Sequence, residues 1–169
     1  YAVGDAILPL NIASGKHAPV ALASTARREA RYVIRNIEAD TPTEKFRGVL
    51  GTSALSVFDY KFAMTGLNDF SAARSDVAVT GSFFKDTLRP SFVENDGNTD
   101  VYVKLNYDQD THKILGGQVM STYDVTAQIN ALALAITTGL TLEDLAEADF
   151  FFQPGFDRQW SLLNLAAQA

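Results

Sequence analysis

The chain has 169 residues, a formal net charge of −6 and no cysteine. The negative charge argues against a nucleic-acid-binding role, and the absence of cysteine excludes disulfides, thiolate metal sites and thiol nucleophiles. Hydrophobic residues make up 47% of the composition, which is ordinary for a domain with one core. With no apparent signal peptide or spanning segment, we expect a cytoplasmic protein without nucleic-acid or membrane partners.

The first forty residues predict the end of a strand, a loop and a long helix. Residues 2–3 are typical of a strand end, and Gly4 and Asp5 of the turn that follows it. Residues 20–37 are rich in alanine and arginine without glycine or proline, and predict a helix with Pro19 at its start. Because the chain opens inside an element and without methionine, we expect it to be cut from a longer protein.

From residue 52 onward the pattern changes to short strands and helices. Strands are predicted where apolar residues alternate, and helices where apolar residues recur every three or four positions. The predicted strands are 52–58, 77–84, 101–107 and 114–121, while 60–64 fits either a strand or the start of a helix. The predicted helices are 68–73, 125–136, 142–148 with Thr141 as its cap, and 157–168, and Asp96–Asn98 predicts a turn.

These elements indicate an α+β fold, in which an antiparallel sheet of three or more strands is flanked by helices. A strand-loop-helix remnant of another domain precedes this sheet. We place the division at the linker around Pro42. The two parts are then residues 1–42 and residues 43–169.

The segment 148–160 carries an unusual amount of aromatic surface. Three consecutive phenylalanines that end at Phe152 are followed by a Pro-Gly break, by Phe156 and by the only tryptophan, Trp160. A soluble protein rarely exposes so many aromatic rings together, and the run is too short and interrupted to cross a membrane. The segment therefore either packs inside the chain or meets a partner.

Two features near the start of the chain fit a ligand site, and each has a simpler interpretation. Asp5 stands where nucleotide-binding folds place an acid that faces the ligand, but an aspartate in a turn also caps its own loop. The start of the helix 20–37 offers free N–H groups to a flat ligand, but a buried helix start also favours small residues. From these residues alone the simpler interpretations are preferred.

The remaining charged residues predict surface rather than chemistry. Arg27, Arg31 and Arg35 form a basic stripe, which we interpret as a solvated helix face paired with Glu29 and Glu38. The two histidines, at positions 17 and 112, lack metal-ligand spacing and have no compact carboxylate cluster beside them. We therefore expect neither a metal site nor a catalytic triad.

Five stretches, taken together and in order, resemble the C-terminal portion of the bacterial NADH oxidase and NADH peroxidase flavoproteins. These enzymes belong to the pyridine nucleotide-disulfide oxidoreductase superfamily. The stretches are YAVGDA (1–6), HAPVALASTARREARYVIRNI (17–37), GTSALSVFDYKFAMTGLN (51–68), KILGGQVMS (113–121) and LEDLAEADFFFQPGFDRQWSLLNLAAQ (142–168). The resemblance covers essentially the whole chain.

The resemblance implies an FAD-dependent oxidoreductase that takes electrons from NADH. Asp5 matches the acid that binds the ribityl chain of FAD. Leu22, Ala23 and Ser24 match the helix start that points at the pyrimidine edge of the isoalloxazine ring. The positive end of a helix dipole suits the negative charge of a reduced flavin, which agrees with the ligand interpretation of this helix.

The resemblance also implies that residues from about Phe46 onward form an interface domain, which assembles a homodimer or a tetramer. Phe152 matches the position at which the aromatic segment contacts the flavin site of the other subunit. Ser53, in the loop that enters the first interface strand, is a candidate for the nicotinamide side.

The chain departs from this family in what it lacks. Members reduce oxygen or peroxide with a redox cysteine and a nearby histidine, but this sequence has no cysteine and neither of its histidines matches. The dinucleotide-binding glycine motifs are also absent, so we expect activity to need the missing N-terminal FAD and NAD domains. Gln159 replaces the usual proline before the tryptophan, which we expect to alter the start of the last helix.

Several alternatives stay open. Oxygen and hydrogen peroxide are about equally supported as the electron acceptor. A coenzyme A-disulfide reductase is a second branch of the family, although Phe156 and Trp160 favour the oxidase and peroxidase branch. A self-standing dimerisation or binding module without redox activity is an alternative of a different class.

Overall fold

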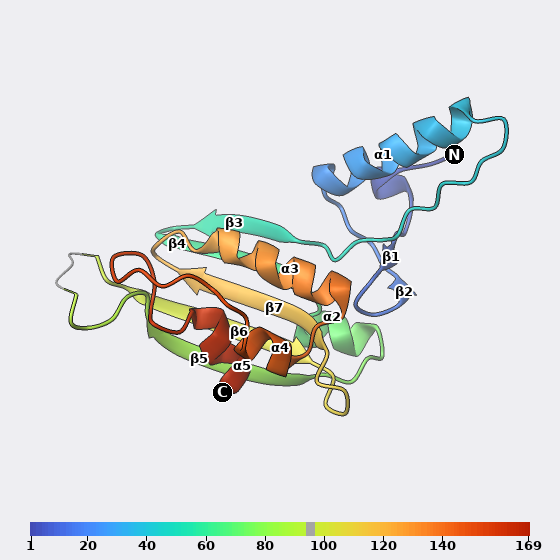
Figure 1. Ribbon diagram of the computed structural model, residues 1–169. Coiled ribbons are helices and arrows are strands. Elements are labelled where there is room, and N and C mark those ends of the chain that lie inside the picture. The colour runs from blue at the N-terminus through green and yellow to red at the C-terminus, as the bar shows by residue number, and fades with distance from the viewer. Residues whose placement is uncertain (94–96) are drawn as a thin grey trace.

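The computed structural model describes residues 1–93 and 97–169 (Figure 1). Its largest element in these ranges is a five-stranded antiparallel sheet in the order β3-β4-β7-β6-β5. The strands are β3 (Ser53–Val57), β4 (Tyr60–Gly66), β5 (Thr80–Thr87), β6 (Asp100–Tyr107) and β7 (Ile114–Ser121). The predicted α+β fold is confirmed, and the ambiguous stretch 60–64 is a strand.

Helices cover one face of the sheet, and the core lies between the two layers (Figure 1). These helices are α3 (Ile129–Thr138), which follows the 3-10 turn η2 (Thr126–Gln128), then α4 (Leu142–Ala146) and α5 (Leu162–Gln168). Val103 of β6, Val119 of β7 and Leu132 of α3 are completely buried there. Because side chains alternate along a strand, Phe83 and Tyr102 point to the other face, which these helices leave open.

Gly116, the first of two adjacent glycines in β7, lies where the backbone approaches another chain segment closely. A Cβ atom at this position would lie 1.8 Å from the carbonyl oxygen of Leu67, a distance that no side chain tolerates. The backbone of β7 therefore touches the residue that follows β4, and the Leu67 N–H donates to the Leu115 carbonyl at 2.9 Å. Glycine at this position is a requirement of the backbone approach.

Asn164 joins α5 to the end of α4. Its side chain is 2% exposed, and its Nδ2 donates to the carbonyl oxygens of Leu145, Ala146 and Ala148 at 2.8, 3.1 and 3.0 Å. Its Oδ1 accepts from the Ser161 N–H at 3.1 Å. The bonds therefore hold both chain ends of the aromatic segment, which we define as residues 149–160.

The N-terminal residues form a separate unit beside the sheet (Figure 1). Its elements are the 3-10 turn η1 (Gly4–Ala6), β1 (Leu10–Asn11), β2 (Lys16–His17) and α1 (Ala23–Glu38). The short helix α2 (Asp69–Arg74) is not part of this unit and follows β4. The unit is attached through Val49, whose N–H donates to Leu10 at 2.8 Å and whose carbonyl accepts from Ile12 at 2.9 Å. After α1 the chain folds back onto the helix, where Glu44 accepts from Arg35 and Phe46 packs against Tyr32. The domain division at 42–43 stays a prediction.

Several predicted boundaries are wrong, each because a local hydrogen bond or backbone angle was not visible in the pattern. The helix α1 begins at Ala23 rather than near Pro19, since Leu22 is still extended with φ −130°. The last helix begins at Leu162 rather than Asp157, since Ser161 caps it by accepting from the Leu163 N–H. The predicted strand end at residues 2–3 pairs with no strand of the described ranges.

Two more elements begin a few residues later than predicted. Strand β5 begins at Thr80 rather than 77, and α3 begins at Ile129 after η2 rather than at 125. The predicted Thr141 cap is confirmed. The turn predicted at Asp96–Asn98 lies partly outside the described residues. In residues 1–93 and 97–169, no helix combines the length and hydropathy that a bilayer crossing requires.

Candidate functional site

The turn η1 presents Asp5 to solvent beside α1. Its neighbour Gly4 has φ +64°, and a Cβ there would lie 3.1 Å from the Cβ of Ala26 on α1. The Gly4 N–H donates to Oε2 of Glu29 at 2.6 Å, and Glu29 is 3% exposed. The turn is therefore pinned to the helix from inside, while the Asp5 carboxylate is left exposed.

The start of α1 is open to a ligand. Leu22 is its N-cap residue and, in the described part of the chain, no side chain accepts a hydrogen bond at this cap. Ala23 and Ser24 are both exposed, so neither bulk nor a capping side chain covers the first turn. The first N–H groups of a helix carry partial positive charge, so this end suits a carbonyl or anionic acceptor.

Ser53 lies close to the region that leads into α1. It is the first residue of β3, where it pairs with Met64 and is half-buried. Two residues earlier, a Cβ on Gly51 would come within 3.9 Å of Val20, which precedes the helix. The chain that leads into β3 and the chain that leads into α1 therefore approach each other at Gly51 and Val20, while a shared site for Ser53 and Ala23 stays a prediction.

The segment that contains Phe152 reaches the other end of the sheet, where the Gly155 carbonyl accepts from Nη1 of Arg89, two residues after β5, at 3.3 Å. In the strand register, the last residue of β5 is level with the β3–β4 hairpin. The hairpin is at the far end of β3 from Ser53, the first residue of that strand. The aromatic segment loops around this far end (Figure 1), and the side chains of Phe151, Phe156 and Trp160 are 68, 69 and 52% exposed. Within one chain, Phe152 therefore does not join the residues around α1.

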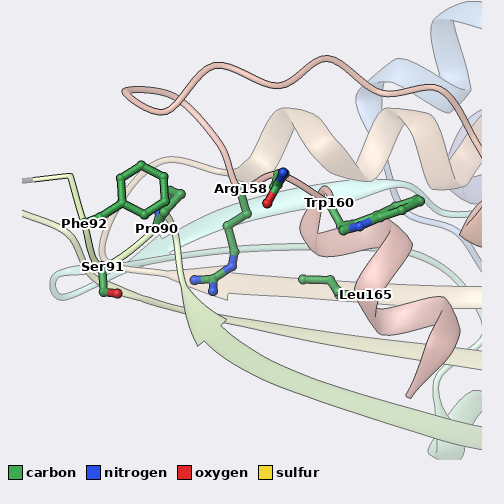
Figure 2. A pocket seen from close by; sticks show the side chains of 7 residues that line it. Pro90, Ser91, Phe92, Arg158, Trp160 and Leu165 are labelled. Atoms are coloured by element: carbon green, nitrogen blue, oxygen red, sulfur yellow. The ribbon is translucent and has the colours of Figure 1, made fainter.

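A groove of about 320 Å³ opens beside the aromatic segment (Figure 2). Phe92, from the chain that follows β5, stands on one side, and Trp160 stands on the other. Arg158 reaches between them toward the end of β5, as its hydrogen bonds to Thr87 show. Burial raises the pKa of the preceding Asp157 carboxyl, while the N–H and the charge of Arg158 oppose that rise.

Two functional features were missed or misread in the sequence. Glu29 is not a surface partner of the basic stripe but a buried acceptor, and Arg35 instead pairs with Glu44 at 3.2 Å. The position of Glu29 four residues after the buried Thr25 would have placed it on the inward face of α1. The contacts of Arg158 with β5 had no local signal, since 71 residues separate it from Thr87.

The two histidines are exposed, as expected, but His112 has a partner. Its Nδ1 lies 2.5 Å from Oε1 of Glu143, and this hydrogen bond lowers the pKa of the Glu143 carboxyl. The Nδ1 of His17 lies 2.7 Å from the Leu8 carbonyl oxygen. Among the residues that the structure describes, no three His, Asp or Glu side chains gather as a candidate metal site.

Comparison with known proteins gives the context for this arrangement. An NADH oxidase of Enterococcus faecalis is 41% identical over all of this chain, which spans 37% of that relative. The solved structure of a water-forming NADH oxidase from Lactobacillus brevis, bound to NADH, has a TM-score of 0.92 and 34% identity, with 99% of this chain and 36% of that one covered. A CoA-dependent NAD(P)H sulfur oxidoreductase of Pyrococcus furiosus is 29% identical over 99% of this chain and 37% of its own length.

The chain thus spans little more than a third of the curated relatives that it matches. Residues 52–162, which contain the whole five-stranded sheet and the aromatic segment, match the family described as pyridine nucleotide-disulphide oxidoreductase, dimerisation domain. The resemblance seen in the sequence motifs is confirmed by this match. The chain belongs to the pyridine nucleotide-disulphide oxidoreductase dimerisation-domain family.

Proposed function

We propose that this chain forms the subunit contact of an FAD-dependent NADH oxidase or peroxidase and supplies parts of two flavin sites. The observation that carries the proposal is the separation within one chain. Asp5 and the start of α1 lie at one end, while the segment that contains the exposed Phe152 reaches the far end of the sheet. Two copies, in which Phe152 of one meets the α1 region of the other, would bring both sets together.

The residues around α1 fit the polar groups of FAD. An exposed carboxylate at Asp5 accepts hydrogen bonds from ribityl hydroxyls, and the uncapped first turn at Ala23 and Ser24 donates to ring carbonyls. The Glu29–Gly4 hydrogen bond holds the Asp5 turn in place. When bound, the flavin supplies the chemistry that accepts electrons from NADH and passes them on. In this proposal Ser53 borders the nicotinamide side and Phe152 covers the flavin of the second copy.

The oxidase branch is better supported than the coenzyme A-dependent branch. The identity of this chain to the E. faecalis NADH oxidase is 41%, against 29% to the CoA-dependent enzyme of P. furiosus. Oxygen is accordingly the acceptor that we propose first, with hydrogen peroxide as the alternative. The remaining two-thirds of the enzyme would carry the redox cysteine and the dinucleotide-binding motifs.

The test uses the complete protein that contains this chain. We expect a yellow protein with bound FAD, a dimer in sedimentation, and NADH oxidation coupled to oxygen consumption. Measuring hydrogen peroxide among the products, and adding it as the only acceptor in the absence of oxygen, separates the two acceptors. A colourless protein that does not oxidise NADH but still dimerises would instead identify a dimerisation module without redox activity.

Asp5→Asn tests the flavin contact. The substitution keeps the size of the side chain but removes the charge that strengthens hydrogen bonds from ribityl hydroxyls. We expect the dissociation constant of FAD to rise roughly 10- to 100-fold, which matches the loss of one charge-assisted hydrogen bond. Release of FAD, followed by flavin fluorescence after ultrafiltration, measures this change.

Asp76→Asn is the matched control, since Asp76 is a fully exposed carboxylate in the turn after α2. It should leave FAD binding unchanged. Equal FAD affinity in wild type and Asp5→Asn would show that Asp5 does not contact the cofactor.

A further inference from the structure

Two arginines tie the aromatic segment to the end of β5. Nη1 of Arg158 donates to the carbonyl oxygen and to Oγ1 of Thr87 at 2.8 and 2.9 Å, and Nη2 lies 2.9 Å from Oδ2 of Asp86. Nη1 of Arg89 donates to the Gly155 carbonyl at 3.3 Å. Arg158 thus reaches from the segment to the strand, and Arg89 reaches back to the segment from the bend that follows the strand.

The Arg158–Asp86 pair is less exposed to water than the other ion pairs among the described residues. The side chain of Arg158 is 23% exposed and that of Asp86 is 37% exposed, so water screens their attraction only in part. The planar guanidinium uses two nitrogens at once, one on the carboxylate and one on Thr87, which a single ammonium group could not do. Arg89 is itself buried.

Apart from the Asn164 bonds at its two ends, the other hydrogen bonds of the segment are local ones, chiefly a turn in which Gln153 accepts from the N–H groups of Gly155, Phe156 and Asp157. Residues 149–160, all of which the structure describes, form turns and extended chain without a helix or strand. Their aromatic side chains point largely into solvent and so cannot anchor the backbone. A loop of this kind loses conformational freedom when it binds, and binding is weakened by that loss unless the loop is already ordered.

We propose that Arg158 is a positioning residue of the subunit contact: with Asp86 and Thr87 it holds the aromatic segment in the shape that a second copy of this chain recognises. The inference rests on the proposed function, in which Phe152 meets a second copy. Arg158 also separates Phe92 from Trp160 in the groove (Figure 2), so the same side chain spaces two exposed rings. It acts through the segment and does not itself need to touch the partner.

The experiment compares wild type with Arg158→Ala, Arg158→Lys and Asp86→Asn. Sedimentation equilibrium of this 169-residue chain gives the dimer dissociation constant, and acrylamide quenching of Trp160, the one tryptophan among these residues, reports how freely the segment moves. For Arg158→Ala we expect a dissociation constant roughly 10- to 100-fold higher and stronger quenching in the monomer. Arg158→Lys keeps the charge without the fork, so it should fall between wild type and Arg158→Ala.

Arg35→Ala is the control, because Arg35 of α1 forms an ion pair with Glu44 at 3.2 Å that lies away from the segment. It should change neither the dissociation constant nor the quenching. If Arg158→Ala does not fold, Asp86→Asn decides the question, since it removes the same ion pair without leaving a cavity.

The outcomes separate this inference from the proposed function. A wild-type dimer whose dissociation constant and Trp160 quenching are unchanged in Arg158→Ala and Asp86→Asn would overturn the positioning role alone. A wild-type protein that stays monomeric at every concentration would overturn the proposed subunit contact, and the positioning role with it.

Discussion

Asn164→Ala should lower the free energy of unfolding by about 3 kcal/mol, because it removes the partner of several buried backbone groups at once. The carbonyls of Leu145, Ala146 and Ala148 lose a common donor, and the Ser161 N–H loses its acceptor. Water does not easily replace these bonds, since Asn164 is almost completely buried. Urea denaturation followed by far-UV circular dichroism measures the change.

Asn130→Ala provides the comparison, since Asn130 is an exposed asparagine on α3. Its effect should stay within about 0.5 kcal/mol, as for most surface substitutions. Similar losses for the two variants would mean that the Asn164 bonds contribute little beyond helix propensity. A selective loss would also show that the two chain ends of the aromatic segment are joined through this one side chain.

Phe152→Asp should weaken dimerisation by roughly 2–4 kcal/mol, the typical cost of losing a central aromatic anchor. The expected result is a dimer dissociation constant about 100-fold higher in sedimentation, because a charged carboxylate must be desolvated where an apolar ring was buried. Trp160→Ala should act in the same direction.

The control for Phe152→Asp is Phe83→Asp, which makes the same change at an exposed phenylalanine of β5. Phe83 lies on the open face of the sheet, away from both the aromatic segment and the α1 region. Its substitution should leave the dimer intact. An unchanged dimer after both Phe152→Asp and Trp160→Ala would place the contact elsewhere on the chain.

The central strands were predictable because their pattern is simple. Val101, Val103 and Leu105 alternate with more polar residues, and one face of the sheet is covered while the other is open, so the period of two survives in the sequence. Helix starts were less predictable. The sequence predicts a last helix that begins at Asp157. The helix instead begins at Leu162, because the reciprocal bonds between Ser161 and Asn164 cap it there.

The candidate site was only partly accessible from the residues themselves. From the residues alone, Asp5 is interpreted as a turn residue and the start of α1 as a buried helix end. Only the family resemblance implies that both contact a flavin. The inward position of Glu29 and the ties of Arg158 and Arg89 depend on contacts between residues far apart in the chain. Periodicity reports which face a residue occupies, but it does not report which distant group that residue meets.

The placement of Asp5 and Phe152 at opposite ends of one chain has a genetic consequence in the proposed dimer. Each flavin site would draw Asp5 from one copy and Phe152 from the other. When an Asp5→Asn subunit pairs with a Phe152→Asp subunit, both changes fall on one site and the second site stays intact. Co-expression of the two variants should therefore give mixed dimers with one wild-type site, and more activity than either variant shows alone.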